Sequence, residues 1–512
     1  MRRILTCLLL CSSLLTQAQK KNKNAEKIAK SITADDMKKH LYTIASKEME
    51  GRDTPSPGLE KAANYIEDNF KSFGLLPGNN NSYRQYYSLY KDSTINTTLM
   101  VNSKAYELNK DFQPQTSNFS GEMFFSEVVF AGYGISDDKR DDYKDLRVAG
   151  KLVMILDGVP AGYSPGQTGF RSSSSITGKI NAARDKGVAA LMIVNNNFPR
   201  TSFGGVSNWS RSSYKTAQSP FTFNISPAVA ASILEKDSKD IFDNSKQRDL
   251  FSKNYVAAID LSFTKAIVST QVSNVIAVLE GTDKKDEYVF ITAHYDHVGK
   301  RNDGTIYYGA DDDGSGTTGV LELAEAFAKA KAAGKGPRRS VVFMTVCGEE
   351  KGLWGSEYYT DHPVFPLEKT TVDLNIDMIG RVGEEYQGKK DSANYIYVIG
   401  DDKLSSDLNP ITEQINKTYS KMNLDRKYND PNDVNRFYYR SDHYNFAEKG
   451  VPIIFYFNGV HADYHKPTDT PDKINYQLMA KRAQLVFYTA WETANRENML
   501  KRDLKLERPR GF

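Results

Sequence analysis

The chain has 512 residues, of which 39% are hydrophobic and 26% are charged, and its formal net charge at pH 7 is +3. A chain of this length can bury large cores, and we expect two or three domains. Acidic and basic residues nearly balance, which removes the electrostatic reason to expect nucleic acid as a partner.

Residues 1–18 predict a secretory signal peptide. They run from two arginines through an apolar stretch to a small-residue end at Ala18. A membrane anchor is the alternative, but the apolar stretch is shorter than the roughly 20 residues that a bilayer span needs. A lipoprotein signal at Cys11 is disfavoured because Leu10 precedes it where a small residue is expected. We therefore expect an exported protein, periplasmic or secreted, with no membrane span.

The rest of the chain divides into three segments that differ in composition and in their pattern of apolar residues. Residues 19–95 predict an N-terminal helical part of the catalytic domain, preceded at 19–30 by a Lys- and Asn-rich lead-in that we expect to be flexible. Residues 96–262 hold short apolar runs separated by Gly, Ser, Asn and Pro, without a cluster of His and acidic residues, which predicts an inserted β-rich accessory domain. Residues 263–512 alternate strand and helix patterns, the signature of an α/β domain with a mostly parallel sheet flanked by helices.

Individual elements are predicted from apolar periodicity and turn signals. In the insert we expect strands at 148–156 and 189–194 and a helix at 179–187. In the catalytic part we expect strands at 288–293, 341–346, 372–376, 394–399 and 451–457, and helices near 317–333, 404–422 and 475–495. Two earlier helices are expected, one starting at Thr33 and one over 58–73.

A set of histidines and acids follows these predicted strands. Carboxyl ends of strands in open α/β sheets lie together, so residues placed there are expected to converge. Histidines and carboxylates without cysteine, with one carboxylate able to bridge, suit a pair of zinc ions at a hydrolytic site. The residues are His294, Asp312, Glu349, Glu350, Asp377 and His465.

Two short motifs within this set suggest a division of roles. In Glu349-Glu350 one carboxylate can bind metal while its neighbour moves a proton, although a solvated pair that opens a helix is the ordinary alternative. In the His294-Tyr-Asp296 motif, Asp296 is placed to receive the second ring N–H of the histidine. Asp469 is expected to support His465 in the same way.

Other features of the sequence compete with this interpretation. Asp311, Asp313, Ser315, Gly316 and Glu322 fit a calcium-loop spacing, but the polar, glycine-containing segment before them does not resemble an incoming helix. Cys347, the one cysteine left after export, is expected to be a buried strand residue, and no internal disulfide is expected. Ser441-Asp442-His443 are too close in sequence to form the proton relay of a nucleophilic triad. His297 and His461 are expected behind the ligands or in structural positions. Arg381 and Arg440 could bind a carboxylate or lie on the surface.

With these motifs in view, the chain resembles the M28 family of zinc peptidases, which includes bacterial aminopeptidases and the glutamate carboxypeptidase type. The resemblance rests on His294-Tyr-Asp296, the 309–316 and 349–356 segments, Asp377-Met-Ile-Gly380 and Tyr464-His465. Residues 34–77 resemble the helical start of exported members, and 96–262 resemble an inserted protease-associated (PA) domain.

The resemblance implies a zinc exopeptidase fold of the phosphorylase/hydrolase type that holds two Zn²⁺ ions per chain. Asp312 would bridge the metals, with His294 and Asp377 on one and Glu350 and His465 on the other. Glu349 would be the general base, Asp296 the orienting carboxylate, and Tyr464 a donor to the oxyanion.

These expectations describe an exported metallo-exopeptidase that acts on peptides, with an aminopeptidase favoured. A carboxypeptidase or a glutaminyl-cyclase-like enzyme on one zinc stays open, as does a non-catalytic binding protein on the same fold. Side-chain preference, the role of the insert and the oligomeric state are left open by the sequence.

Overall fold

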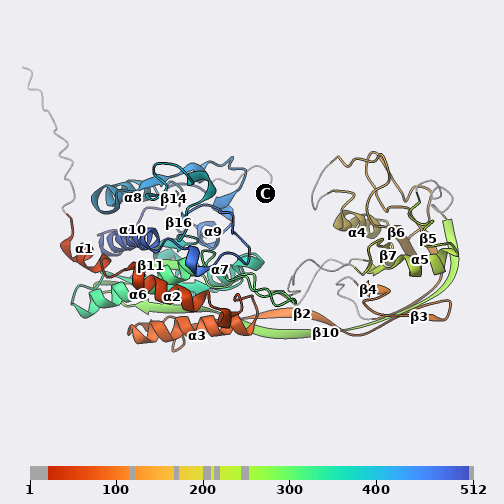
Figure 1. Ribbon diagram of the computed structural model, residues 1–512, viewed down its shortest axis with the longest axis horizontal. Coiled ribbons are helices and arrows are strands. Elements are labelled where there is room, and N and C mark those ends of the chain that lie inside the picture. Colours follow the sequence, from red (N-terminus) through yellow and green to blue (C-terminus); the bar gives the residue numbers. More distant parts are fainter. Residues whose placement is uncertain are drawn as a thin grey trace, which may run out of the picture. The chain divides into compact units, whose positions relative to one another are not determined.

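A computed structural model describes residues 21–114, 121–166, 172–199, 209–212, 220–243 and 253–506 (Figure 1). The predicted signal segment, 1–18, lies outside the described residues. The chain folds into two compact units, the first made of residues 1–87 and 271–512 and the second of residues 88–270. Two long strands, β2 (Arg84–Val101) and β10 (Lys253–Leu279), run through the boundary between the units.

The first unit is built on a mixed sheet with the strand order β15-β14-β16-β13-β11-β12-β10. Strands β12, β11, β13 and β16 are parallel to one another, whereas β14 is antiparallel to β16 and β10 is antiparallel to β12. Every residue of β12, β13 and β16 is buried, as expected for strands covered on both faces. The strands span Lys284–His294 (β11), Arg339–Val346 (β12), Thr370–Ile376 (β13), Tyr395–Ile399 (β14), Asn423–Asp425 (β15) and Ile453–Phe457 (β16), with Leu76–Pro77 (β1) paired to β10.

Helices cover this sheet. The long helices α6 (Gly314–Ala332) and α10 (Tyr476–Asn495) pack on β11, β12 and β13, and α2 (Ala34–Ile44) and α3 (Pro57–Ser72) pack on α6. Thr33 caps α2 and Ser56 caps α3, each by accepting a backbone N–H of the first turn. The other helices are α7 (Trp354–Asp361), α8 (Leu408–Ile415), which continues into a π-helical turn (Asn416–Ser420), and α9 (His443–Glu448).

Two expectations for the N-terminal segment are wrong. Residues 23–29, placed in a flexible lead-in, form helix α1 (Lys23–Ala29), because Asn22 caps its first turn and Ala25 and Ala29 bury one face against α6 and α10. Composition alone does not reveal a helix cap, nor two buried alanines spaced four residues apart in so short a helix. Residues 84–95, assigned to the helical part, belong to strand β2.

The second unit has its own sheet and its own cores. Strands β5, β6, β7 and β9 are parallel, β4 is antiparallel to β9, and the apolar side chains of these strands pack together. The predicted strands at 148–156 and 189–194 correspond to β6 (Leu152–Leu156) and β7 (Ala190–Val194), and the predicted helix at 179–187 corresponds to α4 (Ile176–Asp185). The other elements are β3 (Lys104–Tyr106), β4 (Phe112–Pro114), β5 (Gly121–Phe130), β8 (Trp209–Ser210), β9 (Phe221–Ile225) and α5 (Pro227–Leu234).

The expected insert, residues 96–262, falls within this second unit. Across the described ranges of the chain, none of the helices is both long and apolar enough to cross a bilayer.

Candidate metal centre

The carboxyl ends of three adjacent parallel strands bring the candidate residues together. β11 ends at His294, β12 leads into Glu349 and Glu350, and β13 leads directly into Asp377. The registers of β11 with β12 and with β13 place these ends side by side. Asp312 stands at the start of α6.

All five predicted ligand residues meet at this edge. Nε2 of His294 lies 3.3 Å from Oδ1 of Asp312 and 3.7 Å from Oδ1 of Asp377. Nε2 of His465 lies 2.9 Å from Oδ2 of Asp312 and 3.1 Å from Oε2 of Glu350. The two oxygens of Asp312 therefore face different histidines, which is the arrangement that a bridging carboxylate requires.

The atoms of this cluster fit divalent cations. Nε2 of His294, Oδ2 of Asp312 and Oε1 of Glu350 are buried and have no hydrogen-bond partner. Buried polar atoms without partners are costly, and bound cations would satisfy them. Histidine and carboxylate donors are the set that zinc prefers at hydrolytic sites.

The protonation of the cluster shows the same need for positive charge. Burial by itself would raise the pKa of Asp312, but the neighbouring imidazoles of His294 and His465 hold that pKa well below its ordinary value. Burial would lower the pKa of His465, yet the adjacent carboxylates of Asp312 and Glu350 raise that pKa to about 10. Positive charge placed among these carboxylates is stabilised, and a metal ion would take the place of those protons.

Two neighbouring residues also offer donor atoms to these groups. Donor atoms of His294, Asp313 and Asp377 lie within 4.8 Å of one another, as do those of His297, Asp312 and Glu350. Nδ1 of His297 is 2.9 Å from Oε1 of Glu350, so this buried ring stands behind a predicted ligand.

Asp313 has a different role, because its carboxylate is already occupied. It caps α6 by accepting the N–H of Gly316 at 2.8 Å, and it also accepts the N–H groups of Met378 at 3.0 Å and His294 at 3.3 Å. Gly316 is required at this cap, because a Cβ there would lie 2.3 Å from the carbonyl oxygen of Ile376. Asp313 thus ties the start of α6 to the ends of β11 and β13.

The calcium-loop alternative is not supported by these contacts. Oδ1 of Asp311 accepts from the N–H of Gly380 at 2.6 Å and from Oγ of Ser315 at 3.0 Å, and the Asp313 oxygens are engaged as described above. Glu322 is buried in the middle of α6, where its carboxylate lies 3.7 Å from His40 on α2. The residues of that spacing therefore do not surround a common position.

Asp469 supports the metal loop rather than His465. Its Oδ2 accepts the backbone N–H groups of Asp311 at 2.9 Å and Asp312 at 3.3 Å. His461 reaches the same loop, with Nε2 3.1 Å from Oδ2 of Asp311. The expectation that Asp469 holds His465 is therefore wrong, because its carboxylate instead accepts the backbone N–H groups of the loop that carries Asp312.

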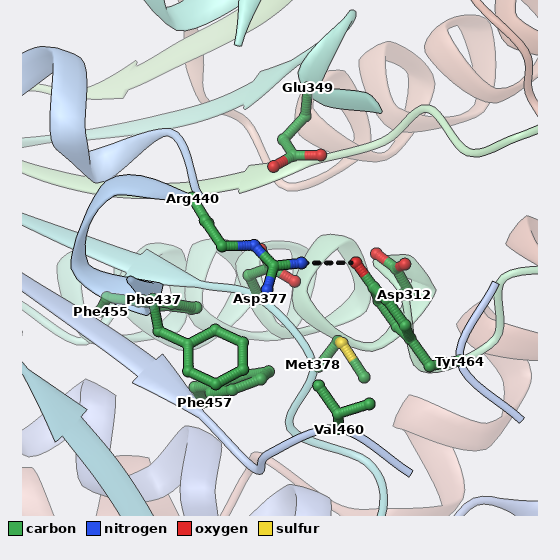
Figure 2. A pocket seen from close by; sticks show the side chains of 10 residues that line it. All are labelled: Asp312, Glu349, Asp377, Met378, Phe437, Arg440, Phe455, Phe457, Val460 and Tyr464. Atoms are coloured by element: carbon green, nitrogen blue, oxygen red, sulfur yellow. Dashed lines mark hydrogen bonds between the residues drawn. The ribbon is translucent and has the colours of Figure 1, made fainter. Parts of the chain in front are cut away.

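Glu349 opens a single 3-10 turn (Glu349–Lys351) directly after β12. Its Oε2 lies 3.9 Å from Nε2 of His294, and its side chain reaches the hollow beside the metal centre from above in the view of Figure 2. Burial raises its pKa well above the ordinary value. A carboxyl group that holds a proton this readily is suited to accept and return one.

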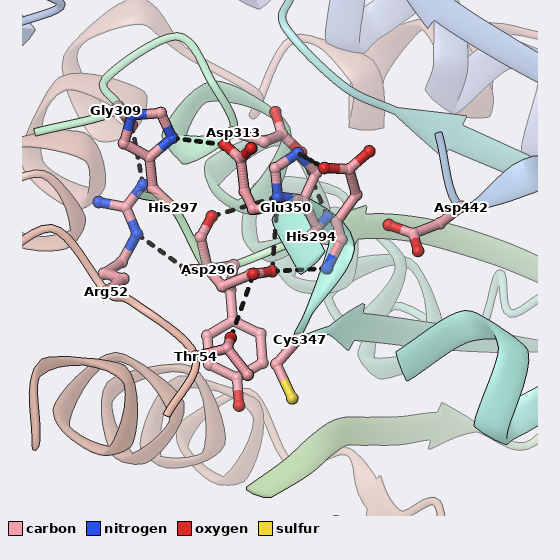
Figure 3. A network of polar contacts seen from close by, with 12 residues as sticks. Arg52, Thr54, His294, Asp296, His297, Gly309, Asp313, Cys347, Glu350 and Asp442 are labelled. Carbon is pink, nitrogen blue, oxygen red and sulfur yellow. Dashed lines mark hydrogen bonds and ion pairs between the residues drawn. The ribbon is translucent and has the colours of Figure 1, made fainter. Parts of the chain in front are cut away.

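Asp296 contacts both Glu349 and His294, and Figure 3 shows it beside His294. Its Oδ1 accepts the backbone N–H of Glu349 at 3.2 Å, and its Oδ2 accepts from Oγ1 of Thr54 at 3.1 Å. Nδ1 of His294 lies 3.2 Å from the backbone carbonyl of Asp296 and 3.7 Å from its carboxylate. Asp296 thus fixes the position of the predicted base as well as that of the histidine.

The sequence did not identify Arg52 as a residue that shapes this centre. Its buried guanidinium donates to the backbone carbonyls of Ile44, Tyr295, Tyr308 and Gly309 at 2.8 to 2.9 Å. Figure 3 shows Arg52 next to Gly309. These bonds tie the N-terminal segment to the loops that follow β11. Arg52 lies within residues 34–77, the segment that resembles the helical start of exported members, and this segment is far from the ligands in sequence.

The centre opens into a small hollow (Figure 2). Tyr464 lines it, and burial raises the pKa of its hydroxyl, which stays protonated and can donate a hydrogen bond. Nη2 of Arg440 lies 3.5 Å from this hydroxyl. The lining residues are Asp312, Glu349, Asp377, Met378, Phe437, Arg440, Phe455, Phe457, Val460 and Tyr464.

The remaining nucleophile candidates are accounted for. Cys347 is buried, its Sγ lies 3.2 Å from the hydroxyl of Tyr87, and burial raises the pKa of the thiol. Ser441 donates to Oδ2 of Asp377 at 2.7 Å, while burial lowers the pKa of His443 to about 3. Ser441 therefore orients a predicted ligand, and the triad reading of 441–443 is excluded.

The segment that carries the centre matches a known family of sequences. Residues 274–490 match the sequence model described as Peptidase family M28. This segment is therefore similar to the peptidases of family M28. The match begins within β10 and ends within α10, so it includes every strand end described above.

Individual relatives of this segment are named as aminopeptidases, as zinc metalloproteases or, in one case, as a probable glutamate carboxypeptidase. "Aminopeptidase YwaD" of Bacillus subtilis is 27% identical over 241 residues, which cover 46% of this chain and 47% of the relative. A "Probable leucine aminopeptidase" of Arthroderma otae is 30% identical over 223 residues, or 43% of this chain and 57% of the relative. The chain spans about half the length of the curated relatives it matches.

Solved structures show that the fold is shared more widely than the sequence. An aminopeptidase from Aneurinibacillus sp. strain AM-1 superposes with a TM-score of 0.52 at 20% identity, over 94% of this chain and 99% of that one. The zinc aminopeptidase BSAP of Bacillus subtilis gives a TM-score of 0.52 at 19% identity, over 93% and 99%. The mixed α/β architecture is thus that of known aminopeptidases.

Proposed function

We propose that this protein is a metallo-exopeptidase that holds two zinc ions and removes N-terminal residues from peptides. The observation that carries the proposal is the position of Asp312, whose two oxygens face His294 and His465 in a buried cluster with unpartnered donor atoms. His294 and Asp377 would hold one ion with Asp312, and Glu350 and His465 would hold the other.

Zinc in this position would supply Lewis acidity, which polarises the substrate carbonyl and makes water a better nucleophile. The residues of the chain would then handle protons and orientation. Glu349 would take a proton from the attacking water and return it to the leaving amine. Tyr464 would donate its hydroxyl hydrogen to the oxyanion, and Asp296 would keep Glu349 in place through its backbone N–H.

The assignment to aminopeptidases rather than carboxypeptidases follows the relatives that match this chain over the longer segments, since the relative named as a probable glutamate carboxypeptidase matches over 120 residues. YwaD, the leucine aminopeptidase of Arthroderma and the two solved structures carry that activity in their descriptions. We also propose export through residues 1–18, which sequencing of the mature N-terminus near residue 19 would test.

The proton-transfer role of Glu349 is tested by Glu349→Gln. Because the amide cannot take a proton, we expect kcat to fall by roughly 10²- to 10⁴-fold, while zinc content measured by plasma mass spectrometry stays near that of the parent. Glu368→Gln, at an exposed position of the same domain, is the matched control and should keep full activity. A Glu349→Gln enzyme with parental kcat would contradict the assignment.

The direction of cleavage is tested with peptides blocked at one end. N-acetylated peptides should resist the zinc-loaded enzyme, whereas C-amidated peptides should lose residues from the free N-terminus, as followed by mass spectrometry. The reverse pattern would identify a carboxypeptidase.

A further inference from the structure

The hollow beside the metal centre has two chemically different walls. On one side stand Asp312, Glu349 and Asp377, the acids assigned to the metals and to proton transfer. The opposite side is apolar and is formed by Met378, Phe437, Phe455, Phe457 and Val460, all in the hydrophobic core cluster of this region or packed against it. Arg440 is the one basic residue among those that line the hollow (Figure 2).

Arg440 has no carboxylate partner among the residues that the structure describes. Its guanidinium stands 5.0 Å from the ring centre of Phe437 and donates a long hydrogen bond of 3.5 Å to the Tyr464 hydroxyl. These neighbours hold the side chain at the wall of the hollow and leave most of its five N–H donors unused. It is exposed, so solvent or a ligand can reach those donors.

Other arginines in the same domain form ion pairs with carboxylates. Arg381 lies 2.8 Å from Asp463 and 3.6 Å from Asp469, and Arg426 lies 2.8 Å from Asp401. Their charges are neutralised within the protein. The charge of Arg440 is not, because the acids that share its hollow face the metal centre.

A second hollow adjoins the first and is bordered by Phe437, Arg440, Val460 and Tyr464 as well. It contains two acids, of which Glu385 is paired with Lys427 at 2.6 Å, and Arg440 is again the one basic lining residue. Arg440 therefore stands where the two hollows meet, beside the place where the scissile bond would lie.

We infer that Arg440 is a specificity-determining residue that binds a substrate carboxylate close to the scissile bond. The inference rests on the proposed exopeptidase function and adds the substrate class. A planar guanidinium binds carboxylate through two parallel hydrogen bonds, and the apolar wall would pack against the methylene groups that lead to it. The carboxylate has two possible sources, the side chain of an acidic N-terminal residue or the C-terminus of a dipeptide.

Two matched substrate pairs distinguish these sources. Glutamyl- and glutaminyl-p-nitroanilide differ only in the side-chain carboxylate, and Leu-Gly and Leu-Gly-amide differ only in the terminal carboxylate. With the zinc-loaded full-length enzyme, we expect kcat/KM to favour the acid in one pair by roughly 10- to 100-fold, the usual effect of a charge-assisted hydrogen bond.

Variants then assign the preference to Arg440. Arg440→Met should remove it by lowering kcat/KM for the acid while changing the neutral member less than about 3-fold, and Arg440→Lys should restore part of it. Arg436→Met, in the same loop but outside both hollows, is the matched control and should keep the preference.

Each outcome is decisive. Hydrolysis of all four substrates without a preference for either acid, or an Arg440→Met enzyme that loses activity equally on both members of a pair, would overturn the inference and leave the exopeptidase proposal intact. No hydrolysis of any of the four would instead refute the proposed function.

Discussion

Single residues behind the ligands set the geometry of the candidate centre. Asp296 illustrates this, because its carboxylate holds the backbone of Glu349 and accepts from Thr54, while its carbonyl faces His294. Asp469, Ser441 and His297 support Asp312, Asp377 and Glu350 in the same manner. Such partners fix the orientation of metal-binding side chains and tune their basicity.

We predict that Asp296→Asn lowers kcat/KM and zinc affinity by roughly 10- to 100-fold, since the amide carries no negative charge beside His294 and turns one of the two acceptor oxygens into a donor. Chelator competition gives the zinc affinity, and steady-state assays give the rate. Thr54→Val, which removes one of these bonds, is the milder control. An Asp296→Asn enzyme within about 3-fold of the parent in both quantities would show that the carboxylate is dispensable.

At the scale of elements, the strand ends and helix α6 form the platform of the site. Helix α6 starts beside Asp312 and is buried along most of its length between the sheet and helices α2 and α3. That burial has a cost at Glu322, whose carboxylate has no hydrogen-bond partner and lies 3.7 Å from His40. Burial lowers the pKa of His40, so its ring offers no full compensating charge at neutral pH.

This arrangement predicts a pH-dependent stability. Burial raises the pKa of Glu322 to about 8 from the ordinary 4.5, so the folded state keeps a proton that the unfolded state loses. The contribution of this group to stability is therefore fully present below about pH 4.5 and is lost as the pH rises toward 8. Asp36, Glu325 and Lys329 also act on this carboxyl, with smaller effects than burial.

We expect Glu322→Gln to raise the free energy of unfolding at pH 8 by on the order of 3 kcal/mol and to change it little at pH 4.5. Urea unfolding at the two pH values measures the difference. Glu325→Gln, a half-buried acid paired with Lys329 on the same helix, serves as the control and should show no such pH dependence. Equal effects of Glu322→Gln at both pH values would contradict the burial argument.

At the scale of the whole molecule, the two units have separate hydrophobic cores. The candidate ligands all belong to the first unit. A ligand stabilises only the part of a protein that binds it, by an amount that grows with the logarithm of its concentration.

We therefore predict two unfolding transitions in calorimetry, of which one responds to metal. Zinc at about 1,000 times its dissociation constant would add about 4 kcal/mol to the first unit, a rise of roughly 10 °C in its melting temperature. A chelator should reverse this shift and leave the other transition in place. A single transition, or equal shifts of both, would show that the units do not unfold independently.

The sequence was informative about elements wherever apolar runs were long. The expected strands at 288–293, 341–346 and 372–376 correspond to β11, β12 and β13, and the expected helix at 475–495 corresponds to α10. It was less informative where short-range features decide, as at helix α1 with its Asn22 cap. It also missed the long strands β2 and β10, which pair with each other from distant parts of the chain, although β2 also pairs with the adjacent β3.

The sequence by itself determined which residue types follow which strands, because the carboxyl ends of parallel strands meet wherever the strands pair. That was sufficient to single out His294, Asp312, Glu349, Glu350, Asp377 and His465 as a set, and the resemblance to M28 peptidases divided the set into expected ligands and an expected base. Only the tertiary structure decided what stands behind and beside them: the buried guanidinium of Arg52, the hydroxyl of Ser441 and the unpaired charge of Arg440. These depend on contacts between segments tens to hundreds of residues apart, which local patterns do not encode.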